Sequence, residues 1–358
     1  MLPCILREDK VNRSIVENRK ETFRQLSDYY RQNVSRFNEI IIVGSGSSNT
    51  SSVTAFQTIE KFSGIITNTM MPNLFMNKTV YNRNALYVFV SQTGSSALTQ
   101  SAVIRAREQG CVTVAISEAP DTKVAKEADL FVNMGSGFEE YGQRTIGFCA
   151  TVLTEMLMGL ELGLINGHIS QNEYDGYVAE AFRMCDNVPK VIESADRWIK
   201  GHLDSLSSGE NYMIFGPKSL YGVAMEGALK ILEVVKKFGA VGYEMDDGLH
   251  GPNMGMTDKT RIIVLSDGVS DQQLAHGIAR YIKNEVGTAY IAGKNVVDDS
   301  DFKLDFVTEN FLSLEFAPFV QLLAYRLAEH LGVEVPLFKD MVLPDQKYFN
   351  THTEHLGK

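Results

Sequence analysis

Short apolar runs recur along the chain, and each ends in a turn rich in glycine and serine. The run at residues 39–43 leads into Gly44–Ser48 and then into a predicted helix around Ser52 to Phe62. The same arrangement returns at residues 211–215, which are followed by Gly216–Ser219. A short continuous apolar run bounded by turn residues is typical of a strand buried in a parallel sheet. The chain therefore contains two copies of a strand–turn–helix arrangement.

Each half continues with further strands and helices at similar spacing. The next strands are predicted at Leu86–Val90 and 112–116 in the first half, and at 261–265 and 288–291 in the second, with helices over 101–110 and 273–284. Strands that alternate with helices in this way predict βαβ units and parallel sheets. The predicted fold class is α/β, with two tandem doubly wound parallel sheets of the flavodoxin-like αβα type and an N-terminal helix.

The expected domain boundaries follow from this pattern. Residues 1–34 form an N-terminal helical extension, with a polar amphipathic helix from Lys10 to Val34 that packs on a neighbouring domain or subunit. The first α/β domain covers 35–165, a helical linker covers 166–205, the second α/β domain covers 206–340, and a C-terminal tail covers 341–358.

The turn that follows the strand at 86–90 is the strongest indication of a ligand. In open parallel sheets, ligands bind beyond the carboxyl ends of the strands. Ser91–Ser96 (Ser-Gln-Thr-Gly-Ser-Ser) places hydroxyls and backbone N–H groups before a helix, where the helix dipole favours an anion. It has no P-loop lysine, and Gly44–Ser48 lacks the third glycine of a dinucleotide site, so a small phosphate is favoured. The alternative is that serine-rich turns only cap their helices.

Three charged residues share one face of a predicted helix in the second half. Glu226, Lys230 and Glu233 are four and three residues apart, and His250 follows after a short loop. Two carboxylates, an ammonium and an imidazole can move protons near neutral pH. A solvated surface helix with i,i+4 ion pairs is the alternative. The helix is also crowded with small residues, namely Gly222, Ala224, Gly227 and Ala228, so we expect the charges to face a cleft.

Composition excludes several classes of protein. The 358 residues carry a net charge of −10 and no basic run, which argues against nucleic acid as a partner. Cys4, Cys111, Cys149 and Cys185 are widely spaced, which suggests reduced thiols in a cytoplasmic protein rather than a zinc site. We expect no bound metal, no cofactor, no signal peptide and no membrane span, and a buried helix over Thr145 to Ile165.

Taken together, these segments resemble the sugar isomerase (SIS) family of two-domain phosphosugar proteins. The resemblance covers about residues 35–340 and is strongest to the isomerase half of glucosamine-fructose-6-phosphate synthase and to fructosamine-6-phosphate deglycases. Ser91–Ser96 matches the family's Ser-Gln-Ser-Gly-x-Thr phosphate loop, and Gly44–Ser48 matches its first-strand turn. Residues 226–233 and His250-Gly-Pro match its catalytic helix and its ring-opening histidine.

The resemblance implies a role for each of these residues. Glu233 would be the base that moves a proton between C1 and C2 of an open-chain phosphosugar, Lys230 would polarise the substrate, and Glu226 would support them. His250 would open the sugar ring and would reach the site from the other subunit of a homodimer; folding back onto its own site is the alternative. The substrate would be bound by hydroxyls and the amide of Ser47, Ser48, Ser91, Gln92, Thr93 and Ser96.

Several departures from the family pattern concern the amine partner. We expect the chain to lack a glutaminase domain of its own. An acidic residue of the phosphate loop is replaced by Ser95, a Ser-Thr-Lys motif is replaced by residues 150–152, and Lys347 is a loose match for a lysine of the family's tail. The leading interpretation is an isomerase or deglycase of a fructosamine 6-phosphate. An ammonia-linked aminosugar-phosphate isomerase or deaminase, and a non-catalytic phosphosugar sensor, are the alternatives.

Overall fold

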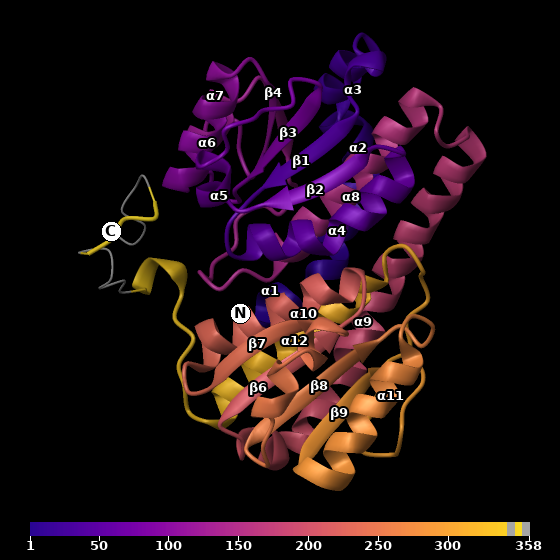
Figure 1. The fold of residues 1–358 in the computed structure, drawn as a ribbon, viewed down its shortest axis with the longest axis vertical. Helices are drawn as coiled ribbons and strands as arrows, with labels where there is room; N and C mark the ends of the chain where they lie inside the picture. The colour runs from indigo at the N-terminus through magenta and orange to yellow at the C-terminus, as the bar shows by residue number, and fades with distance from the viewer. Residues whose placement is uncertain (342–347, 353–358) are drawn as a thin grey trace. The chain divides into compact units, whose positions relative to one another are not determined.

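The computed structural model describes residues 1–341 and 348–352, and these form two compact units (Figure 1). The β1–β5 unit comprises residues 10–179 and the described residues from 336 onward, and the β6–β10 unit comprises residues 1–9 and 180–335. The division falls inside the helix α9 (Gln171–Ser207). The expected boundaries differ from this division, since much of the expected linker at 166–205 belongs with the second sheet.

The β1–β5 unit is built on one parallel sheet. Its strands are β1 (Glu39–Val43), β2 (Ile66–Met70), β3 (Ala85–Val90), β4 (Val112–Ser117) and β5 (Leu130–Asn133), in the order β2-β1-β3-β4-β5. Its helices after β1 are α4 (Ser47–Ser63), α5 (Pro72–Met76), α6 (Ala97–Glu108), α7 (Lys123–Glu127) and α8 (Ile146–Asn166). This strand order is that of the flavodoxin-like doubly wound fold, as the sequence predicts.

The β6–β10 unit repeats the same topology. Its strands are β6 (Asn211–Gly216), β7 (Gly239–Glu244), β8 (Thr260–Ser266), β9 (Thr288–Gly293) and β10 (Phe302–Lys303), in the order β10-β9-β8-β6-β7. Its helices include α1 (Leu2–Ile5), α10 (Ser219–Lys230), α11 (Gln272–Tyr281) and α12 (Leu312–His330). All strand pairs in both sheets are parallel, which confirms the predicted fold class.

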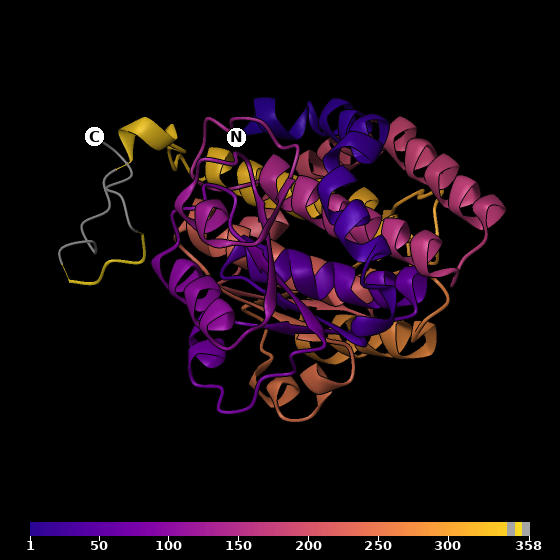
Figure 2. The ribbon, with the colours of Figure 1, turned by 90° about the horizontal axis from the view of Figure 1, so that it is seen from above.

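In each unit, strand residues pack against neighbouring helices. In the β1–β5 unit, Ile41 and Val43 join a buried cluster with Phe75 of α5 and Ala102 of α6. In the β6–β10 unit, Ile262 and the other members of its cluster pack on α11. Helices α4 and α8 lie side by side in the β1–β5 unit, as two views agree (Figures 1 and 2). Each sheet is therefore covered by helices, which matches the αβα layering.

The N-terminal segment differs from its prediction. Instead of one helix over Lys10 to Val34, the structure has α2 (Glu8–Thr22) and α3 (Arg24–Arg31). Phe23, Leu26 and Tyr30 are each 1% exposed, and α3 packs on α8 and β5. The N-terminal helices therefore contribute apolar residues to the core.

The helix α8 is the one described helix that is long and apolar enough to cross a membrane. Its most apolar window is 89% buried inside the structure, so a core position explains its composition. The predicted buried helix over Thr145 to Ile165 is confirmed almost residue for residue.

The sequence predicts a loop between the charged helix and His250, and this is wrong for its first part. Residues 239–244 form β7, which pairs with β6 along its whole length. At Gly242 a Cβ atom would lie 2.4 Å from the backbone nitrogen of Met225, so the glycine lets the strand approach α10 closely. Two short 3-10 turns, Asp247–Leu249 and Pro252–Gly255, make up much of the rest.

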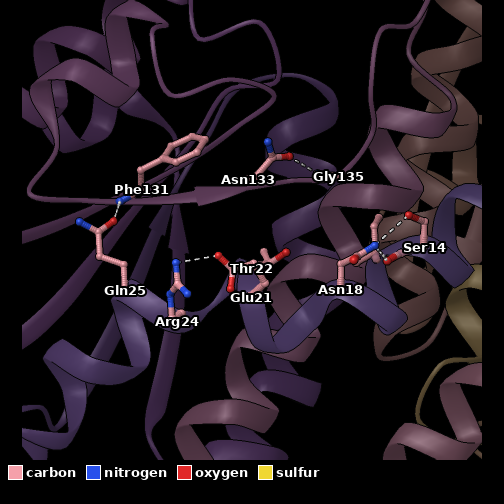
Figure 3. Close-up of a pocket in the computed structure, with 10 residues that line it drawn as sticks. Ser14, Asn18, Glu21, Thr22, Arg24, Gln25, Phe131, Asn133 and Gly135 are labelled. Carbon is pink, nitrogen blue, oxygen red and sulfur yellow. Dashed lines mark hydrogen bonds and ion pairs between the residues drawn. The ribbon is translucent and has the colours of Figure 1, made fainter.

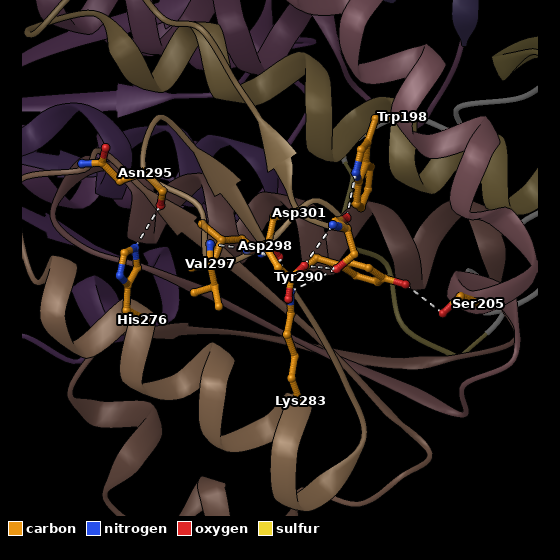
Figure 4. A network of polar contacts seen from close by, with 11 residues as sticks. Trp198, Ser205, His276, Lys283, Tyr290, Asn295, Val297, Asp298 and Asp301 are labelled. Carbon is orange, nitrogen blue, oxygen red and sulfur yellow. Dashed lines mark hydrogen bonds and ion pairs between the residues drawn. The ribbon is translucent and has the colours of Figure 1, made fainter.

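A polar network holds the connection after β9 (Figure 4). The Lys283 ammonium lies 2.7 Å from Asp301 and 2.8 Å from Asp298. Asp301 has a fully buried side chain and also accepts the backbone N–H of Ile291 at 2.9 Å. The ion pair lowers the pKa of the Asp298 carboxyl to about 2. Because every member has a partner, the network is best explained as structural.

Candidate functional site

Two of the predicted substrate-binding turns leave the same edge of the first sheet. Strands β1 and β3 are neighbours, with Val43 opposite Phe89, so Gly44–Ser48 and Ser91–Ser96 follow them at adjacent carboxyl ends. The chain order reverses between these strands, because β2 lies beyond β1 and β4 lies beyond β3. Ligands of open α/β sheets bind at this switch point.

The first of these turns is shaped by two glycines. Gly46 has φ +58°, a left-handed conformation that favours glycine, and it precedes the first residue of α4. At Gly44 a Cβ atom would lie 2.8 Å from the Ser48 carbonyl oxygen, so only glycine fits there without a shift. The helix begins at Ser47, earlier than predicted, so Ser47 and Ser48 belong to its first turn. Both side chains are half-buried.

The second turn presents a row of hydroxyls. Thr93 and Ser95 lie 2.7 Å apart between their hydroxyl oxygens, and the Thr99 hydroxyl donates to that of Ser96 at 2.9 Å. Ser96 is the residue before α6, but its side chain makes no capping hydrogen bond. Simple helix capping, the alternative for this turn, is therefore absent at Ser96. Gly94 has φ +59° and packs against Thr122, where a Cβ atom would come within 2.2 Å.

The C-terminal tail lies against this turn. The Ala97 N–H donates to the Thr351 carbonyl at 3.1 Å, and Ser96 forms an isolated antiparallel bridge with His352. Ala97 is the first residue of α6, so a tail carbonyl occupies one of the N–H groups that an anion at this helix end would use. Lys347, the expected match for the family's tail lysine, is outside the described residues.

Gln92 is a buried residue of this turn. The residue is 9% exposed, and its side-chain amide nitrogen lies 3.4 Å from the Glu139 carboxylate. Glu139 is itself fully buried and accepts the backbone N–H groups of Thr145 and Gly147 at the start of α8. Sequence reasoning missed Glu139, because a carboxylate that caps a helix from six residues away leaves no short motif.

The charged cluster of the second half forms as predicted. The Lys230 ammonium lies 3.1 Å from Glu226 and 2.7 Å from Glu233, which places all three on one face. The α-helix ends at Lys230 and continues as a π-helical turn over Ile231–Val235, which ends at Lys236 with φ +59°. Such turns are rare and occur often at functional sites. The sequence contains no signal for it.

The expectation that all three charges face a cleft is wrong. The side chains of Glu226 and Lys230 are 0% exposed, and only that of Glu233 reaches the surface, at 37%. Burial alone would lower the pKa of Lys230, but the two carboxylates outweigh it and raise that pKa above its usual value. Lys230 is therefore a permanent cation that holds Glu233, and Glu233 is the member available to a ligand.

His250 is exposed and lies in the loop after β7. Its side chain is 71% exposed, and within the described chain its ring contacts only Asp246, with Nδ1 at 2.9 Å from the carbonyl oxygen. This hydrogen bond and the Asp246 carboxylate raise the pKa of His250. Met254, four residues on, is 89% exposed. No contact joins His250 to Glu233 among the described residues, so its predicted role stays a prediction.

Neither described hollow is lined by a predicted site residue. One of about 530 Å³ lies between α2, α3 and β5, where Gln25 accepts the Phe131 N–H at 3.3 Å (Figure 3). Another of about 620 Å³ lies at the start of α11, beside Asp271 and Gln272. The polar groups of the first hollow largely satisfy one another, as Asn18 with Ser14 illustrates.

The sequence and the fold are similar to those of known phosphosugar proteins. The model of the SIS domain matches residues 34–184. The glutamine–fructose-6-phosphate aminotransferase (isomerizing) of Corynebacterium diphtheriae is 26% identical over 215 residues, which is 60% of this chain and 34% of that protein. A solved candidate phosphosugar isomerase from Clostridium difficile 630 superposes with a TM-score of 0.86 at 23% identity, covering 96% of this chain and 95% of the other.

The C-terminal domain of glucosamine-fructose-6-phosphate aminotransferase from Francisella tularensis has a TM-score of 0.81 at 20% identity, and the match covers 93% of this chain and 97% of that domain. The match to the SIS domain covers residues 34–184, and the β6–β10 unit repeats the strand order of the β1–β5 unit. The chain spans between 34% and 56% of the length of the curated relatives it matches.

Proposed function

We propose that the protein is a phosphosugar isomerase or deglycase that acts at C1/C2 of an amino or glycated sugar 6-phosphate, of the fructosamine 6-phosphate type. The observation that carries the proposal is the Glu226–Lys230–Glu233 cluster, with its buried ammonium and one accessible carboxylate. A positioned carboxylate can act as a general base, and the Lys230 ammonium holds this one in place. Its relatives carry isomerisation of fructose 6-phosphate in their names, which supports this class of reaction.

In this proposal Glu233 moves a proton between C1 and C2 of the open-chain sugar. Lys230 is a positioning residue rather than a substrate contact, since its side chain is 0% exposed. It holds the Glu233 carboxylate through a bond of 2.7 Å, and it is held in turn by Glu226. A positioned general base contributes about 10² to 10⁴ in rate.

Phosphate recognition is assigned to the hydroxyls of Ser91–Ser96 and of Ser47 and Ser48. These groups follow β3 and β1 at the switch point of the first sheet, and Ser96 precedes a helix whose dipole favours an anion. Net charge does not oppose this, because backbone and hydroxyl donors act locally. The Thr351 carbonyl that now occupies the Ala97 N–H would leave when phosphate binds there.

His250 is assigned to opening of the sugar ring, in a homodimer where it serves the partner's site. Its 71% exposure and the exposed Met254 nearby support a role outside its own unit. A raised pKa lets an imidazole carry a proton near neutral pH, which ring opening requires. We place this dimer in the cytoplasm, in keeping with four buried free cysteines.

A panel of substrates tests the proposal. The protein is incubated with several fructosamine 6-phosphates, with glucosamine 6-phosphate, and with fructose 6-phosphate plus ammonia, and the products are read by mass. Release of the amine or isomerisation by the wild type, absent from Glu233→Gln, supports the proposal. Binding of these sugars without turnover would indicate a phosphosugar sensor instead.

A further inference from the structure

A buried carboxyl group lies directly behind the first turn of α4 and takes no part in the proposed reaction. Glu155 of α8 is 0% exposed, and its Oε1 lies 2.8 Å from the hydroxyl of Ser52. Its Oε2 is buried without a hydrogen-bond partner among the described residues. The Ser52 hydroxyl also lies 2.8 Å from the carbonyl oxygen of Ser48. A chain of three groups thus connects the interior of the β1–β5 unit to the Gly44–Ser48 turn.

Which hydrogen bonds form among Glu155, Ser52 and Ser48 depends on whether Glu155 is protonated. The Ser52 hydroxyl has one hydrogen and cannot donate to Glu155 and Ser48 at once. If Glu155 is protonated, its O–H donates to the Ser52 oxygen, and the Ser52 O–H donates to the Ser48 carbonyl. If Glu155 is ionised, it can only accept, so the Ser52 hydrogen turns to the carboxylate and leaves Ser48. Ionisation therefore removes one bond from the first turn of α4.

The surroundings favour the protonated form. Burial raises the pKa of Glu155 to about 8, and the single hydrogen bond from Ser52 lowers it only in part. The charged groups on the elements that contact α8, and on α8 itself, have other partners or are exposed. These groups are Glu60, which accepts the Thr67 N–H, exposed Lys61, Arg24 paired with Glu21, Arg31 paired with Asp28, and Glu161, which contacts Lys20 and Tyr174.

We propose that Glu155 is a positioning residue that carries a proton at neutral pH and, through Ser52, holds Ser47 and Ser48 in place for the sugar phosphate. Loss of that proton loosens the first turn of α4 and weakens binding. The assignment of a ligand to this turn rests on the proposed function. The hydrogen-bonded chain itself does not, and the two can be tested apart.

Hydrogen exchange tests the hydrogen bonds among Glu155, Ser52 and Ser48 without any ligand. Protection of the amides of residues 49–52, corrected for intrinsic rates, is measured from pH 6 to pH 9.5 in the wild type and in Glu155→Gln. The amide of glutamine is neutral and can still donate to Ser52. Protection should fall in the wild type as pH rises through about 8, and should stay level in the variant. Glu161→Gln is the matched control, because Glu161 lies on the same helix but takes no part in the hydrogen bonds of Glu155, Ser52 and Ser48. This variant should behave like the wild type.

Titration calorimetry with fructose 6-phosphate and with inorganic phosphate then tests the consequence for binding. Loss of one hydrogen bond corresponds to about a two- to tenfold rise in Kd. This rise should appear above pH 8 in the wild type, be absent in Glu155→Gln, and be present at every pH in Ser52→Ala. The Ser52 variant also serves if Glu155→Gln does not fold.

The outcomes separate the two proposals. Equal protection in the wild type and Glu155→Gln at all pH values overturns the inference, even if Kd changes with pH, because another group would then titrate. A pH-dependent loss of protection in the wild type alone, without binding of either probe, supports the hydrogen-bonded chain and contradicts the proposed phosphosugar site.

Discussion

Replacing Lys230 by methionine should destabilise the β6–β10 unit strongly. The ammonium lies 3.1 Å from Glu226 and 2.7 Å from Glu233, and neither Lys230 nor Glu226 has any exposed side-chain surface. Removing one partner of a buried ion pair costs about 3–5 kcal/mol, since the remaining charge loses its counter-ion in a medium of low polarity. Glu233 contributes little to this cost, because water reaches its side chain.

The pH dependence of this variant follows with a definite sign. Without the ammonium, burial raises the pKa of Glu226 in the folded state above its unfolded value of about 4.3. A carboxyl whose folded pKa is raised stabilises the protein fully below its unfolded pKa, and this contribution is lost as pH rises toward the folded pKa. The variant should therefore be closest to the wild type at pH 4 to 5 and weakest above neutrality.

A single tryptophan makes the measurement specific. Trp198 is the chain's one tryptophan and lies in the same unit as Lys230, with its indole N–H donating to Ser300 at 3.1 Å. Urea unfolding followed by its fluorescence therefore reports on the right unit. Lys237→Met is the matched control, since among the described residues its exposed ammonium contacts only the Leu331 carbonyl. It should change the free energy of unfolding by less than about 0.5 kcal/mol.

Glu226→Gln combined with Lys230→Met is the decisive variant. It removes the buried anion together with the buried cation, so it should recover most of the lost stability. If Lys230→Met costs less than about 1 kcal/mol, or if the double variant is as unstable as the single one, the ion pair is not what holds this cluster.

Four further predictions concern activity, binding and pH. Glu233→Gln should lower turnover about 10²- to 10⁴-fold while sugar binding survives; near-normal activity on the true substrate would exclude Glu233 as the base. Ser91→Ala combined with Ser96→Ala should weaken binding of a sugar phosphate, measured by calorimetry, by one to several decades, because each hydrogen bond to a charged group contributes about 1.5–3 kcal/mol. An equal loss of affinity for the unphosphorylated sugar would show that the phosphate binds at another place. Inactive Glu233→Gln and His250→Ala chains, when mixed, should regain about half the activity per heterodimer, since one shared site is intact; subunit exchange without recovery would place His250 in its own site. Burial raises the pKa of Glu155 to about 8, so the wild type should lose on the order of 5 kcal/mol of unfolding free energy between pH 4.5 and pH 8. Chemical denaturation at a series of pH values measures this loss. An equal loss in Glu155→Gln would contradict the assignment to Glu155.

Much of the fold could be predicted because its strands are continuous apolar runs. The strands β1, β3, β4, β6, β8 and β9 are buried on both faces, which leaves an unbroken hydrophobic signal in the sequence. The edge strands β2 and β5 mix polar and apolar residues, and β7 contains two glycines, so these strands resemble loops. Their assignment depends on pairing with a neighbour, which only the folded chain provides.

The candidate site could be predicted in residue type more than in environment. The spacing of Glu226, Lys230 and Glu233 is enough to place them on one face, but it cannot say that two of them are buried. Burial depends on which neighbouring elements cover the helix. The same limit applies to Glu155, whose chemistry depends on Ser52 at a separation of 103 residues in the chain.

The repeated strand order also bears on how such a chain can evolve. When one topology is present twice, each loop at a switch point has a counterpart that selection is free to alter. After β3 the chain keeps the hydroxyl-bearing turn Ser91–Ser96, whereas after β8 the corresponding turn carries Asp267 and Asp271, which would repel an anion. After β6 the corresponding helix carries the Glu226–Lys230 pair, while the first residues of α4, 47–54, are mostly serine and threonine. Duplication followed by specialisation of each copy would account for a protein whose proposed anion-binding and acid–base residues reside in different halves.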